Sequence, residues 1–435
     1  MKIAIVGSGI SGMGAALALS EEHEVVLLEA DDRFGGHANT VEVAGTPVDT
    51  GFIVYNHDNY PHLTGLFDHL GVPTKASDMS FGMSIDGGRT EYACDDVWRI
   101  FAQPVNLLRP RFVGGVREIL RFHRDAPKDL EAGRLAGVTL GRYLKREGYG
   151  DWLRDSFLLP MGGAIWSTPV GDMLDFPAEN FVAFFRNHEL MNGNGPGKRW
   201  RTVDGGSREY VRRLLAAFEA NGGEARTGAR VTAVTRTGGR PVLRMQDGSE
   251  MAVDNVVLAT HGPQGRALLS DADGQEDAIL GAFETSANEA VLHSDPRLMP
   301  KRKRVWSSWN FLSDGADGGR PAPITYWMNR LQGIDRAQPL FVSLNPGVEP
   351  DPALVHGRFA YAHPLFTQES FDAQSRIDTV QGRGGVWYAG AWLGYGFHED
   401  GLRSGLRVAA AMGALPSWRG EEVSPIAGTF AQAAE

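Results

Sequence analysis

Residues 2–37 read KIAIVGSGISGMGAALALSEEHEVVLLEADDRFGGH, and this stretch decides the fold of the chain. It opens with an apolar strand, residues 2–6, which runs directly into the motif GSGISG at residues 7–12. A helix over residues 15–19 and a second strand over residues 24–28 follow. Strand, glycine-rich turn, helix and strand in this order predict a parallel sheet that binds a dinucleotide.

Each glycine of the motif has a steric reason. Gly7 permits a tight turn, Gly9 lets the backbone approach a pyrophosphate, and Gly12 lets the helix pack closely on the strand. The helix N-terminus then presents unpaired N–H groups to the phosphates. Glu29 closes the second strand about 20 residues after Gly9, where an acidic residue binds a ribose 2′-hydroxyl.

A second glycine pair, Gly35-Gly36, indicates which dinucleotide is bound. A nicotinamide domain can enter its next helix directly, whereas a flavin needs an extra loop whose backbone reaches the ribityl chain and ring. Taken alone, the pair is equally well explained by an ordinary turn. Two later segments favour the flavin.

The first of these segments is residues 203–261, in which a helix over 207–221 leads to strands over 230–235 and 256–259. The last strand returns the chain to the nucleotide sheet. The second segment is GVWYAGAWLGYGFHEDGLRSGLRVAAA from Gly385, in which a strand ends at Gly390 and a helix begins near Glu399. The N-terminus of that helix can face the flavin pyrimidine and stabilise its reduced anion.

These segments together resemble the FAD-dependent amine oxidase and phytoene desaturase superfamily over nearly the whole chain. Within it, the chain is most similar to the bacterial FAD/NAD-binding oxidoreductases associated with cyclopropane-fatty-acid-synthase-like enzymes. The segments that carry the resemblance are GGHANTV at Gly35, DTGFIVYN at Asp49, GAIWSTP at Gly163, WRTVDGGSREYV at Trp200, TYWMNRLQ at Thr325 and GFHEDGLRSGLRVA at Gly396. One branch of that group desaturates methylated acyl chains in furan-fatty-acid synthesis, so the resemblance implies a lipid substrate and a lipid methyltransferase as pathway partner.

Departures from the amine oxidase pattern weaken an amine substrate. His37 stands where the superfamily usually has an arginine that meets the FAD phosphates. Ala391 and Trp392 stand where an acidic residue usually follows the C-terminal strand. Phe397 matches one of the two aromatic rings that enclose an amine, and the other has no clear counterpart.

The fold class that follows is α/β, with a Rossmann-like FAD-binding domain and a discontinuous α+β substrate domain. We assign residues 1–75, 200–262 and 380–415 to the FAD domain, 76–199 and 263–379 to the substrate domain, and 416–435 to a loose C-terminal tail. In the substrate domain we expect a helix over 176–190 and strands over 305–312, 324–328, 340–344 and 358–363. Gly193, Gly195 and Gly197 sit with Pro196 in an expected loop, so we expect no second, NADPH-binding domain.

Non-covalent FAD is the expected cofactor, because Cys94 lies far from the C-terminal flavin motif and cannot supply the thioether of some amine oxidases. We expect FAD to contact Gly7, Gly9, Ile10, Ser11, Gly12, Glu29, Ala30, Arg33, Gly35, Gly36, His37, Gly51, Phe52, Val231, Gly390, Glu399 and Leu402. Glu399 has two possible roles, FAD binding or capping of its helix.

The expected reaction transfers a hydride from an allylic carbon of an unsaturated or methyl-branched acyl chain to flavin N5, with loss of a neighbouring proton. His398 is the leading base, and the alternative is that it supplies only its backbone N–H to the flavin. We expect an apolar substrate pocket lined by Tyr55, Asn56, Trp166, Trp309, Trp327 and Phe397. Three other functions remain open: an amine or polyamine oxidase, a double-bond isomerase, and a non-catalytic FAD-binding accessory protein of a lipid methyltransferase.

Composition restricts the function further. The net charge of −10 argues against nucleic acid as a partner. No apolar run reaches the roughly 20 residues of a membrane-spanning helix. The first strand begins after a single lysine, so we expect no secretory signal. The chain has only one cysteine, so we expect a cytoplasmic location. The 12 histidines are scattered without a HExxH motif, so we expect no metal.

Basic residues are nevertheless concentrated in residues 98–124, where six arginines and several aromatic residues accompany one acid, Glu118. One interpretation is peripheral contact with anionic lipid at the inner face of the membrane. The other is a substrate-domain helix with a solvated basic side, whose apolar face is formed by Val113, Val116, Ile119 and Leu120. A second basic run, PKRKR at residues 300–304, fits a solvated loop.

Overall fold

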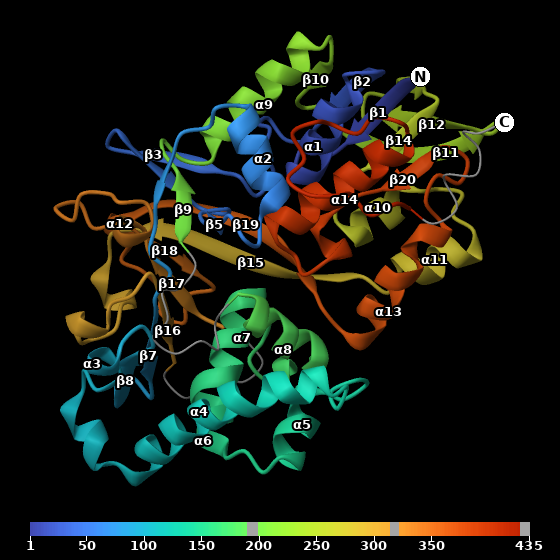
Figure 1. Cartoon of the computed structure of the whole chain (residues 1–435). Helices are drawn as coiled ribbons and strands as arrows, with labels where there is room; N and C mark the ends of the chain where they lie inside the picture. The colour runs from blue at the N-terminus through green and yellow to red at the C-terminus, as the bar shows by residue number, and fades with distance from the viewer. Residues whose placement is uncertain (189–198, 314–321, 427–435) are drawn as a thin grey trace.

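The computed structural model describes residues 1–188, 199–313 and 322–426. A five-stranded parallel sheet in the order β10-β2-β1-β14-β20 occupies the end of the molecule that carries the N-terminus (Figure 1). Its strands are β1 (Lys2–Val6), β2 (Glu24–Leu28), β10 (Glu224–Arg226), β14 (Asn255–Leu258) and β20 (Val386–Tyr388). The sheet is therefore assembled from three separate parts of the chain.

Both faces of this sheet are covered, as the side-chain alternation of β1 requires. Ile3 and Ile5 point to one hydrophobic cluster and Ala4 and Val6 to the other. The first cluster lies under the helices α1 (Ile10–Leu19), α2 (Pro61–His69), α9 (Arg208–Ala220) and α14 (His398–Ala411). The second lies under α10 (Gly262–Leu268), α11 (Gly274–Leu280), α13 (Gln368–Arg376) and an antiparallel sheet of β11 (Val231–Thr237), β12 (Arg240–Met245) and β13 (Glu250–Ala252). The Rossmann-like part of the predicted fold class is confirmed.

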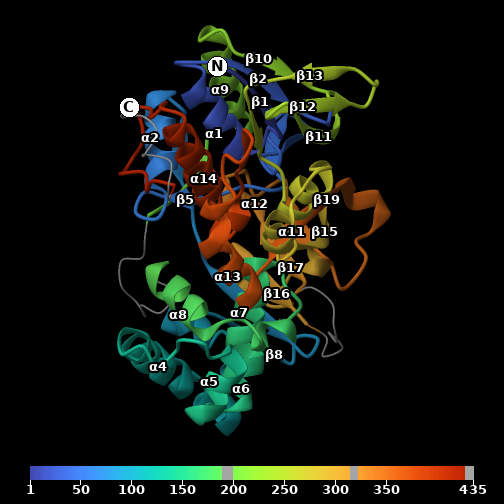
Figure 2. The same ribbon diagram turned by 90° about the vertical axis from the view of Figure 1, so that its right-hand side faces the viewer.

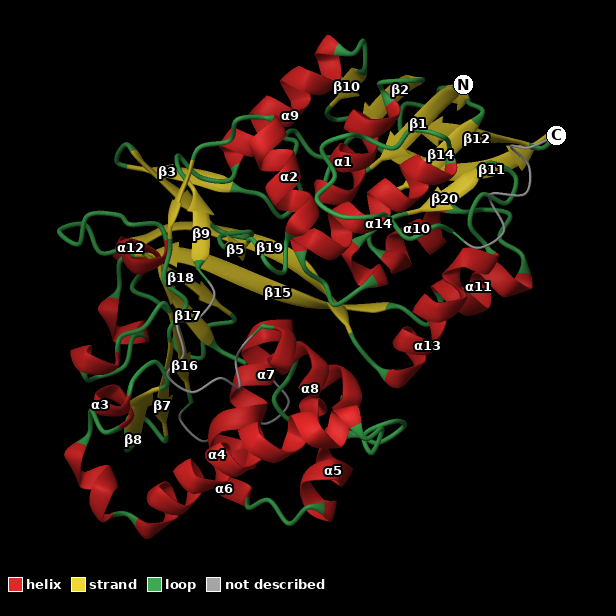
Figure 3. Cartoon of the chain, in the orientation of Figure 1, coloured by secondary structure: helices red, strands yellow, loops and turns green. Residues whose placement is uncertain are grey.

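A seven-stranded sheet in the order β19-β15-β18-β17-β16-β7-β8 forms the centre of the remaining part (Figure 3). Its strands are β7 (Phe81–Ile85), β8 (Thr90–Ala93), β15 (Glu284–His293), β16 (Trp309–Leu312), β17 (Ile324–Trp327), β18 (Phe341–Leu344) and β19 (Val355–Leu365). The strand expected over 305–312 begins only at Trp309, because residues 303–305 form a short 3₁₀ turn. Met328 does not extend β17, since it opens the short helix α12 (Met328–Leu331).

Two small sheets join the large ones. One pairs β3 (Thr40–Val43) with β4 (Thr46–Asp49), and the other places β9 (Trp200–Val203) between β5 (Tyr55–Asn56) and β6 (Thr74–Ala76). Helices surround the far end of the seven-stranded sheet in both views (Figures 1 and 2). These are α3 (Val97–Ile100), α4 (Pro110–Glu131), α5 (Leu140–Arg146), α6 (Asp151–Leu153), α7 (Leu159–Trp166) and α8 (Ala178–Asn187). This mixture is the α+β substrate part that the sequence predicted.

The helix expected over 176–190 is observed as α8, while its last two positions and the predicted loop with Gly193, Gly195 and Gly197 lie outside the described residues. The apolar face predicted for residues 113–120 is partly wrong. Phe112 and Gly115 are buried, with the backbone of Gly115 against the indole of Trp152, whereas Leu120 is exposed. In the described ranges no helix is long and apolar enough to cross a membrane.

The expectation of a loose tail is wrong for residues 416–426. Trp418, Val423 and Ile426 are buried in the cluster under α2 and α14. A Cβ at Gly420 would lie 1.9 Å from the carbonyl oxygen of Pro61, so the segment lies directly on α2. It closes an apolar surface that would otherwise be open to water, and residues 427–435 are outside the described part.

We predict that Ile426→Ala lowers the free energy of unfolding by about 2–5 kcal/mol, because it removes a fully buried side chain. Thermal or urea unfolding of the purified protein measures the effect. Val348→Ala, at an exposed position, is the matched control and should change stability little. Equal stability of the two variants would contradict the packed tail.

Candidate functional site

The glycine turn between β1 and α1 is shaped to accept an anion. Gly7 has a φ of +103°, a conformation that favours glycine. A Cβ at Gly12 would lie 2.0 Å from the carbonyl oxygen of Gly7, so the turn has no space for a side chain there. No side chain caps the helix at Gly9, which leaves the N–H groups of Ile10 and Ser11 for a ligand.

Glu29 lies beside this turn, at the end of β2. Its Oε2 accepts hydrogen bonds from the backbone N–H of Ser8 at 2.9 Å and from the Ser8 hydroxyl at 2.5 Å. The N–H of Ala229 donates to the carbonyl oxygen of Glu29 at 2.7 Å, which brings Val231 at the start of β11 close to Glu29 and Ala30. The acidic residue and the predicted apolar contact are thus adjacent.

The second glycine pair packs against the first. Gly35 and Gly36 have φ values of +112° and +56°, and a Cβ at Gly36 would lie 3.0 Å from the Cα of Gly9. Arg33 stabilises this loop, because its guanidinium donates to the carbonyl oxygens of Gly36 at 2.8 Å and Ala38 at 3.3 Å. Its role is therefore to hold the loop.

Gly51 and Phe52, in the connection between β4 and β5, pack against this loop. The N–H of Phe52 donates to the carbonyl oxygen of His37 at 2.9 Å. A Cβ at Gly51 would lie 2.1 Å from the same oxygen, so only glycine fits. The backbone at Gly9, Gly36 and Gly51, which belong to three separate motifs, is therefore in contact. We predict that the flavin binds along it.

The imidazole of His37 lies among other aromatic rings. Its Nε2–H donates to the carbonyl oxygen of Ala362 at 3.1 Å, and its ring stacks on Tyr361 at 5.1 Å between centroids. The rings of His363 and His261 lie 5.5 and 5.6 Å away. Burial, with a contribution from His363, holds the pKa of His37 well below its ordinary value. The lowered pKa disfavours a charged ring, and the expected contact of His37 with FAD stays a prediction.

The C-terminal motif places a second helix N-terminus beside the first. The N-cap residue of α14 is Phe397, whose ring offers no acceptor to the first turn. The N–H of Gly390, between β20 and α14, donates to Ser404 Oγ at 2.8 Å. Leu402 is fully buried against α1, where a Cβ at Gly14 would lie 2.3 Å from its Cδ1.

The His398 side chain points between Phe52 and Tyr210. Its ring stacks on Phe52 at 3.8 Å between centroids, and its Nε2 lies 3.0 Å from the hydroxyl of Tyr210. Burial lowers the pKa of His398 to about 3, so the ring is uncharged near neutral pH. An uncharged imidazole can either accept the Tyr210 O–H at Nε2 or donate its Nε2–H to the Tyr210 oxygen, and only the second tautomer leaves Nδ1 unprotonated.

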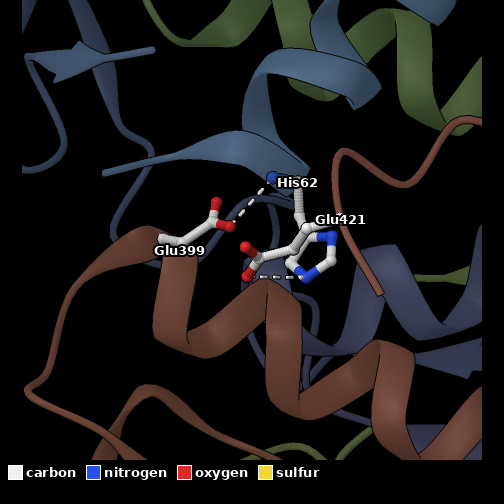
Figure 4. Close-up of side chains that lie close together, drawn as sticks. All are labelled: His62, Glu399 and Glu421. Atoms are coloured by element: carbon white, nitrogen blue, oxygen red, sulfur yellow. Dashed lines mark hydrogen bonds and ion pairs between the residues drawn. The ribbon is translucent and has the colours of Figure 1, made fainter. Parts of the chain in front are cut away.

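The side chain of Glu399, in the first turn of α14, caps the neighbouring helix α2 (Figure 4). Its carboxylate accepts the N–H groups of His62 at 2.9 Å and Leu63 at 3.0 Å, at the N-terminus of α2. The expected capping of α14 by this side chain is therefore wrong, and FAD binding by Glu399 stays a prediction. Burial raises the pKa of this carboxyl to about 7.

Glu421 of the C-terminal segment joins this group. A ring nitrogen of His62 and a carboxylate oxygen each of Glu399 and Glu421, atoms of the kind that bind metal ions, lie within 4.8 Å of one another. The carboxylate of Glu399 already accepts two backbone N–H groups, and Glu421 forms an ion pair with Arg403 at 3.5 Å. We therefore assign these side chains to joining α2, α14 and the C-terminal segment.

Two of the residues expected in the substrate pocket belong to one aromatic chain. Phe397 stacks on Phe184 at 5.0 Å, and Trp166 lies 4.8 Å from Phe184. Both rings contact Phe184 of α8, so Trp166 and Phe397 lie in the same region, and their place in a substrate pocket stays a prediction.

The other four expected pocket residues lie elsewhere. Trp309 packs edge-on against Tyr326, and Trp327 packs edge-on against Trp306, both within the seven-stranded sheet part. Tyr55 is a core residue 5.2 Å from the ring of Phe67. Asn56 is fully buried, where its Oδ1 accepts the N–H of Asn59 and its Nδ2 has no partner. Apolar packing under α2 explains why Tyr55 does not face a pocket.

Sequence reasoning missed several residues around the site, namely Tyr210, His261, Tyr361 and His363. Tyr210 lies on a helix whose inner face could be recognised from its apolar period, but its partner His398 is 188 residues away. Tyr361 and His363 lie on β19, and the pairing of β19 with β15 positions them beside His37.

Comparison with known proteins identifies the family. The family model of flavin containing amine oxidoreductases matches residues 10–332, well over half of the chain. The chain belongs to this family. Rice polyamine oxidase 3 is 24% identical over 261 residues, which cover 59% of this chain and 50% of that protein. Rice polyamine oxidase 1 is 28% identical over 342 residues, 70% of this chain and 59% of that protein.

Solved structures share the fold of this chain. Putrescine oxidase bound to putrescine has a TM-score of 0.70 at 16% identity and covers 95% of this chain and 99% of its own. The CLA-producing fatty acid isomerase of P. acnes has a TM-score of 0.65 at 16% identity and covers 93% of this chain and 96% of its own. The chain spans about half the length of the first curated relative, rice polyamine oxidase 3.

FAD is the cofactor of this family member, and the residues present fit it. The uncapped first turn of α1 would take the pyrophosphate, and Glu29 would take the adenosine ribose. The N-terminus of α14 and the backbone around Gly36 and Gly51 would hold the ring end. Cys94 lies in the substrate part, buried enough to raise the pKa of its thiol to about 12.

We predict that Gly12→Ala yields a colourless protein without bound FAD, because the added Cβ meets the Gly7 carbonyl. The visible flavin absorbance of the purified protein measures this. Gly114→Ala places the same methyl group on a helix with open space around it and should leave the protein yellow. A yellow Gly12→Ala variant would contradict the assigned phosphate turn.

We predict that replacing Glu399 by Gln changes the pH dependence of stability. The folded-state pKa of about 7 lies above the ordinary value of 4.5, so ionisation lowers the free energy of unfolding as pH rises between these values. Glutamine cannot ionise, and the Tm of Glu399→Gln minus that of the parent should therefore increase between about pH 5 and pH 8. Thermal scans of the FAD-loaded proteins measure it, with the exposed Glu21→Gln as a control that should show no such trend.

Proposed function

We propose that this flavoprotein dehydrogenates an unsaturated or methyl-branched fatty acyl chain. The observation that carries the proposal is the chemistry of the described residues around the C-terminal motif. Phe397 faces Phe184, and the same cluster contains Trp166, Phe366 and Tyr395. This buried aromatic cluster, next to the partly exposed Phe397 and Tyr395, supplies the apolar contacts that a long acyl chain would need.

The carboxylates of this motif are engaged and do not serve an amine. Glu399 accepts two N–H groups of α2. Asp400 accepts the N–H groups of Tyr395 at 3.1 Å and Phe397 at 3.0 Å. A cationic amine substrate would need an uncommitted carboxylate to balance its charge, and these two carboxylates already accept backbone N–H groups.

The proposed reaction needs a hydride acceptor, a proton acceptor and a dry surface. FAD, when bound, supplies the hydride acceptor. Loss of a hydride from an allylic carbon makes the neighbouring C–H strongly acidic, so even a weak base suffices. His398 is uncharged near neutral pH, and in the tautomer whose Nε2–H donates to the Tyr210 hydroxyl its Nδ1 is free to take the proton while Tyr210 fixes the orientation of the ring.

An amine or polyamine oxidase is the second candidate, because the rice relatives are polyamine oxidases. The similarity to a fatty acid isomerase shows that the fold can act on a fatty acid, and it supports the acyl substrate class. A redox-neutral isomerase and a non-catalytic accessory protein are distinguished from the proposal by the same experiment.

The experiment follows the flavin absorbance under anaerobic conditions. We expect a phospholipid with a methyl-branched, unsaturated acyl chain to bleach the flavin and to yield a product with one more double bond. A phospholipid with saturated straight chains is the matched control, and putrescine and spermine are added in parallel. Bleaching by amines alone would establish the oxidase instead, and a shifted double bond without bleaching would establish an isomerase. A flavin that only dithionite bleaches, with unchanged lipid, would contradict the proposal.

We predict that His398→Ala retains FAD and slows lipid-dependent bleaching by about 100-fold or more, as expected for loss of a general base. Tyr210→Phe removes only the hydrogen bond to Nε2 and should slow the reaction less. Because the pKa of His398 is about 3, the rate should show no inflection from this residue between about pH 5 and pH 8. Unchanged bleaching in His398→Ala would leave this residue with its backbone N–H alone.

A further inference from the structure

Large exposed apolar side chains gather in one stretch of the described chain. Trp98 is 81% exposed, Leu108 82% and Leu120 61%, and Val105 and Leu107 are also exposed. The remaining described side chains of this kind, Met1, Val348 and Leu415, are scattered. Single exposed apolar residues need no explanation, but a group of them marks a surface that meets another apolar phase.

The segment Gln103–Leu108 has an inverted pattern, with polar residues inside and apolar residues outside. Gln103 is buried, where its Oε1 accepts the N–H of Glu91 at 2.9 Å and its Nε2 donates to the carbonyl oxygen of Arg89 at 3.0 Å. Asn106 is fully buried and donates to the carbonyl oxygen of Glu91 at 3.2 Å. These bonds anchor the segment to β8 and hold Val105, Leu107 and Leu108 toward water.

Two basic runs that are distant in the sequence meet beside this apolar group. Arg99 Nε donates to the carbonyl oxygen of Arg304 at 3.0 Å, which places residues 301–304 next to α3. Lys301, Lys303 and Arg304 are exposed. On the other side, α4 exposes Arg111 and Arg117 to solvent.

Glu118 is the one acid among the arginines of residues 98–124, and its carboxylate is already hydrogen-bonded. Its carboxylate accepts the N–H of Gly150 at 2.9 Å. The region is thus locally basic in a chain whose net charge is −10. Figures 1 and 2 both place α4 at the end of the molecule away from the N-terminus and the parallel sheet.

We propose that residues 98–120 and 301–304 form a surface that docks on an anionic lipid bilayer. The side chains of Trp98, Leu107 and Leu108 enter the headgroup and upper acyl region, and the surrounding arginines and lysines bind anionic headgroups. The chain would lie on the membrane through this surface. Docking complements the proposed acyl substrate, but vesicle binding is measured without turnover, so either idea can fail alone.

The test is flotation of the FAD-loaded protein with vesicles of equimolar phosphatidylcholine and phosphatidylglycerol, and with vesicles of phosphatidylcholine alone. We expect binding to the anionic vesicles at low salt, weaker binding at high salt and little binding to phosphatidylcholine. The double variant Arg111→Gln/Arg117→Gln should lower the partition coefficient roughly 30-fold. Its control is Arg212→Gln/Arg244→Gln, exposed arginines of the nucleotide-binding part, which should bind as the parent does.

The apolar contribution is tested with Leu107→Ser/Leu108→Ser, which should lower partition by more than tenfold. Val348→Ser/Leu415→Ser removes two exposed apolar side chains elsewhere and should have no effect. Brominated lipids should quench tryptophan fluorescence in the parent and lose most of that quenching in Trp98→Phe. Flavin absorbance and Tm, unchanged in all variants, show that each is folded.

Three results would overturn the proposal. The first is absence of binding to anionic vesicles at low salt. The second is binding that the Arg111/Arg117 and Leu107/Leu108 variants leave unchanged, which would place the contact elsewhere. The third is equal binding to vesicles with and without phosphatidylglycerol. Recruitment of the protein to vesicles only through an added methyltransferase would likewise assign this surface to a protein partner.

Discussion

Close packing between α1 and α14 is the contact on which the cofactor site depends. A Cβ at Gly405 would lie 2.3 Å from the carbonyl oxygen of Ser11, and a Cβ at Gly401 would lie 2.8 Å from its hydroxyl. Because β1 and β20 run parallel, the helices that follow them begin at the same edge of the sheet. Two helix N-termini, each with a positive partial charge, therefore lie at the same edge of the sheet, where FAD would bind.

The acidic side chains near this edge of the sheet accept backbone N–H groups, so the N-termini of α1 and α14 are its main source of electrostatic potential. Glu399 caps α2 and Asp400 orders the loop before α14, so both acids act on backbone N–H groups. Burial lowers the pKa values of His37, His363 and His398, which keeps these rings neutral. The result is a site edge with little side-chain charge, at which the two helix N-termini supply the main electrostatic field.

The two ends of the molecule follow opposite rules of side-chain placement. Around α1 and α14 the apolar residues are inside, and the C-terminal segment with Trp418 and Ile426 completes their cover. In residues 103–108 the polar residues are inside and the leucines are outside. Hydrogen bonds to β8 stabilise this inversion, so the exposed leucines are a built feature of the fold.

The sequence by itself determined the parallel nucleotide sheet, the positions of its glycine turns and the start of α14. These depend on short-range rules: glycine conformations, the order of strand and helix, and the spacing from Gly9 to Glu29. Only the tertiary structure decided the partners of His37, His398 and Glu399, which lie 325, 188 and 337 residues from them in the chain. The physical reason is that hydrogen-bond partners and burial are set by contacts between distant segments, and no local pattern encodes which segments will meet.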